Sequence, residues 1–133
     1  MPSYKDFEEL PIWKDARELT REVYMLTNQR EFKNDRGLRD QLQRSIVSVG
    51  SNIAEGFDRS TDKDFAHFLS ISKASIAEVR AQLYFALDLG YITDAQQTET
   101  NRNLKQLGNQ VGGFIQYLRG EKRNRAAIKN HGS

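Results

Sequence analysis

After Pro11 the chain contains no proline, and its apolar residues recur at steps of three and four in four successive segments. That spacing places apolar side chains on one face of an α-helix. Proline would break such a helix, whereas Pro11 suits a first turn, where its missing N–H costs nothing. The pattern therefore predicts an all-α chain, with helices at about 11–28, 36–57, 62–88 and 94–119.

Capping residues stand at the predicted helix boundaries. A short polar side chain before a helix can accept a hydrogen bond from a free backbone N–H of the first turn. The candidates are Asn34 or Asp35, Thr61 with Asp64, and Thr93 with Gln96, and Gly90 supplies a left-handed residue at a helix end. With the polar run 28–35 taken as a loop, these signals specify an antiparallel up-down-up-down four-helix bundle.

The composition suits one soluble, globular domain. Hydrophobic residues make up 38% of the 133 residues and charged residues 29%, which is too apolar for a disordered chain. The start carries no apolar run typical of a signal peptide, and no window resembles a membrane span. With no cysteine, disulfides and thiolate metal sites are excluded. We expect a cytoplasmic protein with a bundle at 1–119 and a basic tail at 120–133.

The net charge of +2 hides an asymmetry. Residues 119–133 hold five basic residues and one acidic residue, whereas residues 1–118 hold 15 basic and 17 acidic residues. The positive excess therefore belongs to the tail, and this bears on any interaction with nucleic acid.

The second predicted helix is unusually rich in small and polar residues. Ser48, Asn52 and Glu55 follow one another at spacings of four and three, on one side of the helix. Serine and glycine form helices poorly, so tertiary contacts must hold this segment. Close helix packing with internal hydrogen bonds is the favoured interpretation, and a ligand or partner site is the alternative.

Three stretches of the sequence resemble one family. They are FEELPIWKDARELTREVYMLT at 7–27, QLQRSIVSVGSNIAEGFDRS at 41–60 and FLSISKASIAEVRAQLYFALDLGYI at 68–92. The run from Ser48 to Gly56, with the pattern S-x-x-x-N-I-A-E-G, is its most specific part. The chain resembles the bacterial four-helix-bundle proteins encoded by intervening sequences in 23S ribosomal RNA genes. The structural polar residues of this signature are Ser48, Asn52, Glu55, Gly56 and Glu78.

The resemblance implies a homo-oligomer, commonly a pentamer. It also implies a relationship to the accessory protein of diversity-generating retroelements, which binds a reverse transcriptase and nucleic acid through a basic surface. Most members of the family have no established activity.

Catalytic chemistry finds little support in the sequence. A di-iron bundle needs two Glu-x-x-His motifs, whereas this chain has only Asp64-x-x-His67. No G-x-S-x-G motif accompanies the serines, and no phosphate-binding glycine loop is present. Glu55 and Glu78 on neighbouring helices are better suited to structural hydrogen bonds than to a carboxylate pair in an open cleft. We therefore expect no enzyme, cofactor, metal or small-molecule substrate.

Nucleic acid, or an enzyme that acts on it, is the functional hypothesis that the charges favour. Phosphate neutralisation requires clustered lysine and arginine. The candidates are Arg36, Arg39 and Arg44 near the start of the second helix, and Lys122, Arg123, Arg125 and Lys129 in the tail. The alternative is a structural or protein–protein interaction module, in which the aromatic residues Tyr4, Phe7 and Trp13 lie either in the core or between subunits.

Overall fold

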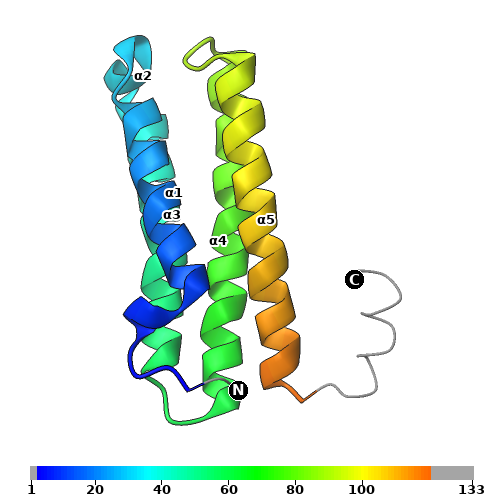
Figure 1. Cartoon of the computed structure of the whole chain (residues 1–133). Coiled ribbons are helices and arrows are strands. Elements are labelled where there is room, and N and C mark those ends of the chain that lie inside the picture. Colours follow the sequence, from blue (N-terminus) through cyan, green and yellow to red (C-terminus); the bar gives the residue numbers. More distant parts are fainter. Residues whose placement is uncertain (1–2, 121–133) are drawn as a thin grey trace, which may run out of the picture.

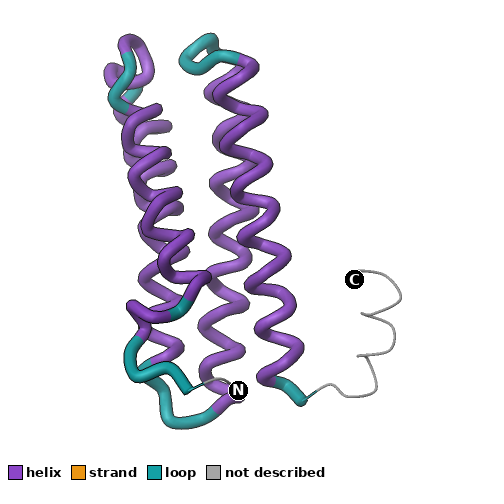
Figure 2. Tube along the Cα trace, viewed as in Figure 1, coloured by secondary structure: helices purple, strands orange, loops and turns teal. Residues whose placement is uncertain are grey.

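Every regular element in residues 3–120, the part of the chain that the computed structural model describes, is helical (Figure 2). The elements are a 3-10 turn η1 (Phe7–Glu9) and the helices α1 (Pro11–Thr27), α2 (Arg30–Asn34), α3 (Arg36–Phe57), α4 (Asp62–Asp88) and α5 (Asp94–Leu118). The all-α prediction is confirmed.

The four long helices run antiparallel to their neighbours (Figure 1). α3 packs against both α1 and α4, and α5 packs against both α4 and α1, so the helices close into a ring around one core. The contact between α3 and α4 is the most extensive. α2 lies at one end of the bundle, whereas the chain leaves α5 at the other end (Figure 1).

Each long helix turns an apolar face inward, as its spacing predicts. Leu42 and Ile53 of α3, Leu69 and Leu83 of α4 and Leu104 of α5 are completely buried. Removing a side chain of this size from water stabilises the fold by about 1.5–3 kcal/mol. Burial of these faces, rather than helix propensity, therefore keeps the serine-rich α3 helical.

The predicted capping residues occupy the starts of α3, α4 and α5, although at Thr61 and Asp64 one bond of the expected reciprocal pair is present. Asp35 accepts a hydrogen bond from the backbone N–H of Leu38, and Thr61 accepts one from that of Asp64, both at 3.1 Å. Thr93 and Gln96 complete a reciprocal capping box before α5. Gly90, after α4, has a φ of +77°, the left-handed conformation that glycine adopts without strain.

The prediction of a loop at 28–35 is wrong, because this run contains α2. Phe32 is fully buried, and its ring stacks on that of Tyr91 with 5.2 Å between centroids. A single apolar residue within a polar run gives no periodicity, so the sequence pattern could not reveal this anchor. α2 closes the end of the core beside the turn between α4 and α5.

Asp35 joins the two turns at this end of the bundle. One carboxylate oxygen caps α3, and the other accepts a hydrogen bond from the Tyr91 hydroxyl at 2.9 Å. This hydrogen bond, with desolvation and the negative charge of Asp35, raises the pKa of Tyr91 above its usual 10.0. The hydroxyl is therefore held in its protonated, donating form.

The amino-terminal aromatic residues pack against the core. Tyr4, Phe7 and Trp13 are partly buried, and the rings of Phe7 and Trp13 meet edge to face at 5.0 Å. Of the two alternatives, the core or an interface between subunits, these contacts favour a position against the core.

Gly56 allows the end of α3 to approach the start of α4. A Cβ at this position would lie 2.8 Å from side-chain atoms of both Phe65 and Phe68, and 3.2 Å from the backbone oxygen of Phe65. Those distances are too short for a carbon atom. The glycine of the signature is therefore required by packing.

We predict that Gly56→Ala destabilises the fold by about 1–3 kcal/mol, because the new methyl group forces two phenylalanines apart. The measurement is urea unfolding followed by circular dichroism. Gly113→Ala is the matched control, since a Cβ there meets no atom within 4 Å. The control should stabilise the protein by up to about 1 kcal/mol through helix propensity. Equal effects of the two substitutions would contradict the close approach.

We predict that Tyr91→Phe changes how stability depends on pH. The folded protein binds the Tyr91 proton more tightly than the unfolded chain, so this stabilising contribution is complete below pH 10 and is lost as pH rises through the raised pKa. The difference in melting temperature between the two proteins should therefore be largest near neutral pH and shrink in alkali. A difference that does not depend on pH would refute the hydrogen bond to Asp35.

Candidate interaction surfaces

The polar residues of the α3 signature lie mainly inside the contact with α4. Ser75 donates a hydrogen bond to the hydroxyl of Ser48 at 2.9 Å. The Asn52 amide donates both to the Ser48 hydroxyl at 2.9 Å and to the Ser48 carbonyl oxygen at 2.8 Å. Ser72, fully buried, donates to the carbonyl oxygen of Val49 at 2.8 Å. These hydrogen bonds join the two helices and hold them close together.

Glu55 and Glu78 lie apart on the surface. Because Ser48 is opposite Ser75 in an antiparallel pair, Glu55 and Glu78 are displaced in opposite directions and differ by about 15 Å along the helix axes. Glu55 forms an ion pair with Arg59 at 2.9 Å, and both glutamates are exposed. They form neither the hydrogen-bonded structural pair nor a catalytic carboxylate pair.

The histidine of the bundle stands outside the core. His67 is exposed on α4, and its ring meets that of Phe68 edge to face at 5.7 Å. Within residues 3–120 no group of three or more His, Asp or Glu side chains is arranged to hold a metal ion.

Of the two predicted basic clusters, one lies within the described residues. Arg36 and Arg44 are exposed near the start of α3. Arg39 is instead engaged, donating to the carbonyl oxygen of Lys33 at 2.9 Å and pairing with Asp40 at 3.2 Å. The other cluster, Lys122, Arg123, Arg125 and Lys129, lies outside the described residues.

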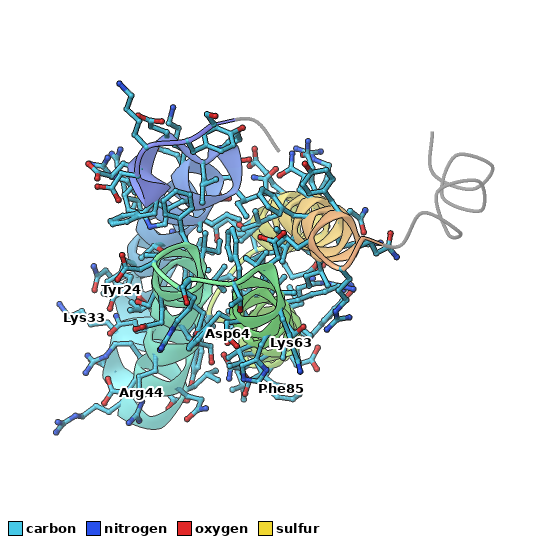
Figure 3. All side chains as sticks on the ribbon, turned by 90° about the horizontal axis from the view of Figure 1, so that it is seen from below. Tyr24, Lys33, Arg44, Lys63, Asp64 and Phe85 are labelled. Atoms are coloured by element: carbon cyan, nitrogen blue, oxygen red, sulfur yellow. The ribbon has the colours of Figure 1, made fainter. Side chains whose placement is uncertain are left out.

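The outer side of α4 carries a stripe of exposed residues, apolar except for the central Glu78, that the sequence analysis missed. We define the α4 seam as five exposed residues that alternate in steps of three and four: Ile71, Ala74, Glu78, Ala81 and Phe85. Ile71 is 38% exposed and Phe85 55% exposed. Figure 3, a view along the bundle, shows Phe85 on the side of α4 turned away from α1. The signal in the sequence was that apolar residues occur on every side of α4, and not on one face alone.

A groove between α4 and α5 is positively charged. Two adjoining hollows share Arg119, one lined also by Lys63 and His67 and the other by Lys73, and we call the two together the basic groove. Its floor includes Gly112 and the exposed Ala74 and Ala77, and its lining contains no carboxylate. Lys63 projects outward from the first turn of α4 (Figure 3). These cations stand singly on two helices, so no cluster of basic residues appears in the sequence.

The other side of α5 has the opposite charge. Asp15, Glu18 and Glu22 of α1 line a groove together with polar residues of α5, and no lysine or arginine is among the lining residues. Glu22 accepts hydrogen bonds from Thr100 at 2.8 Å and Asn103 at 3.4 Å, which tie α1 to α5. We call this the acidic groove. α5 therefore separates two grooves of opposite charge.

Two glycines of α5 face α4. A Cβ at Gly108 would lie 3.8 Å from Ile76, and one at Gly112 would lie 3.4 Å from the ammonium nitrogen of Lys73. Gly113 faces open space. An alanine at Gly108 or Gly112 would therefore make ordinary contacts with α4, and one at Gly113 would make none.

Among the helices described, none is long and apolar enough to cross a membrane.

Comparison with known proteins gives a family and a fold. The family model for the 23S rRNA-intervening sequence protein matches residues 8–113. A crystal structure of a protein of unknown function from the S23 ribosomal protein family of Bacteroides thetaiotaomicron superposes with a TM-score of 0.69. The two chains are 21% identical over 78% of this chain and 97% of the other, a likeness that shows the fold alone. No curated protein matches significantly.

The matched residues include all of α1, α3 and α4, with the seam and the hydrogen-bonded signature between α3 and α4. The chain belongs to the 23S rRNA-intervening sequence protein family.

Proposed function

We propose that the protein is a non-enzymatic module whose copies associate through the α4 seam. The observation that carries this proposal is the spacing of the exposed residues on α4, which repeats that of a coiled-coil contact. Ile71 and Phe85 stand seven residues on either side of Glu78, and alanines lie between them. Small residues at alternate positions allow another helix to approach closely, and large ones fill the spaces in that helix.

Covering the exposed surface of the seam contributes favourably to association. Phe85 is 55% exposed and Ile71 38%, so each adds about 0.5–1.5 kcal/mol, roughly half of what full burial of such a side chain gives. A contact between unlike faces of successive copies closes into a ring when the rotation permits. The family resemblance favours such a homo-oligomer, and five is the subunit number that it implies.

Binding of nucleic acid, or of an enzyme that acts on it, is a second candidate function. Exposed cations favour it, because Arg36 and Arg44 stand free of the ion pairs found in residues 3–120. The basic residues at 122–129 add to this charge. A purely structural or protein–protein interaction module, without contact to nucleic acid, is the function that remains if this candidate fails.

We predict that the double substitution Ile71→Glu with Phe85→Glu dissociates the oligomer. Charges on the seam must be desolvated when it is covered, so the subunit dissociation constant should rise about 100-fold or more. The measurement is sedimentation velocity at micromolar protein concentration. Circular dichroism checks that the variant stays helical, which is expected because both side chains are exposed.

The matched control is Tyr24→Glu with Met25→Glu. These side chains are also apolar and exposed, but they lie at the end of α1 and away from the seam. The control should leave the subunit number unchanged. A monomeric wild-type protein, or an equal loss of association in both variants, would rule out association through the α4 seam.

A further inference from the structure

We propose that the basic groove between α4 and α5 is a binding site for the phosphodiester backbone of nucleic acid. The proposal deepens the second candidate function above and is independent of self-association. It assigns the contact to Lys63, Lys73 and Arg119, with His67 between them, and not to Arg36 and Arg44 of α3.

The cations of the groove form a row. Lys63 and Lys73 are separated by ten residues of one helix, which is about 15 Å along its axis. Arg119 follows directly after α5, and its guanidinium lies 3.5 Å from the hydroxyl of Ser70. Because Ser70 stands between Lys63 and Lys73 on α4, Arg119 lies between the two lysines. Each strand of a nucleic acid carries about one negative charge per 3.4 Å of helix axis. A row of this length therefore faces about four phosphates and exceeds the size of a single small anion.

The charges of this row are available to a ligand. None of Lys63, Lys73 and Arg119 takes part in an ion pair within residues 3–120. Lys73 lies across the glycine surface of α5, where the ammonium nitrogen would be 3.4 Å from a Cβ at Gly112. Binding phosphate consequently breaks no existing ion pair.

The charges on either side of α5 favour an anion in the basic groove over the acidic groove. The basic groove has no carboxylate in its lining, whereas the acidic groove on the other side of the helix has three. The carboxylates nearest to Lys63 in the sequence are Asp62 and Asp64, in the first turn of α4, where they oppose the positive end of the helix dipole. A polyanion is therefore attracted to one face of α5 and repelled from the other.

The floor of the groove favours a phosphate chain over an acidic protein helix. An amphipathic helix needs large apolar side chains to pack against. The apolar residues here are the small Ala74 and Ala77 together with Ile115 and Leu118, which are only 7% and 6% exposed. Charge without an exposed apolar surface suits a ligand that is recognised through its phosphates.

The test is a fluorescence anisotropy titration of the full chain with a labelled 20-nucleotide single-stranded RNA at several salt concentrations between 50 and 200 mM. Lys63→Glu with Lys73→Glu is the groove variant. Arg36→Glu with Arg44→Glu is the control variant for the competing basic cluster on α3, and it makes the same change in net charge. We expect the groove variant to weaken binding by at least tenfold and the control by less than threefold. Lys63→Gln with Lys73→Gln should lower the slope of log affinity against log salt by about two.

Circular dichroism and sedimentation velocity establish that the variants keep their fold and subunit number. If the wild-type protein has no affinity for RNA at 50 mM salt, the nucleic-acid candidate fails and this site fails with it. If RNA binding survives in the groove variant but is lost in the control, or on removal of residues 120–133, the candidate function stands and the groove assignment is overturned. If polyglutamate displaces the RNA at equal charge concentration, the ligand is an acidic protein and the phosphodiester assignment is wrong.

Discussion

The close contact between α3 and α4 determines where the remaining helices of the bundle lie. Hydroxyl groups of Ser48, Ser72 and Ser75 replace larger side chains along this contact and bond to one another or to the backbone. Gly56 brings the two helices together at its end. α4 buries an inner face that combines large residues such as Phe65 and Leu83 with the small Ser72 and Ser75. Its outer side is exposed and still carries the apolar residues of the α4 seam.

Much of this fold could be predicted from the spacing of apolar residues. The four long helices begin and end within one residue of the predicted positions, because apolar faces and caps such as Asp35 and Thr93 act locally. α2 could not be predicted, since Phe32 is held by its stacking on Tyr91, 59 positions along the chain. That contact forms only when the four long helices close around the core, and no local sequence pattern predicts it.

The candidate surfaces were less accessible to sequence reasoning. The clustering of basic residues along the chain favours Arg36, Arg39 and Arg44 as a site. In the folded chain, however, Arg39 donates to the carbonyl oxygen of Lys33 and pairs with Asp40. The basic groove joins Lys63 and Lys73 of α4 with Arg119 of α5, and these residues meet only when two helices pack. The Ser48 motif was easier to interpret, because small polar residues at helical spacing favour close packing wherever the partner helix lies.

Self-association and phosphate binding, if both hold, would strengthen one another. A row of three cations gives a weak and salt-dependent contact by itself, since each lysine or arginine neutralises about one phosphate. When copies are joined, binding of one groove places the next near the same strand at a high effective concentration, and avidity can exceed the single affinity by 10²–10⁴. The α4 seam and the basic groove lie on adjacent sides of one helix, so α4 would set the distance between successive grooves. A protein of this kind acts on a partner by making many weak contacts at once, and this requires no catalytic residue.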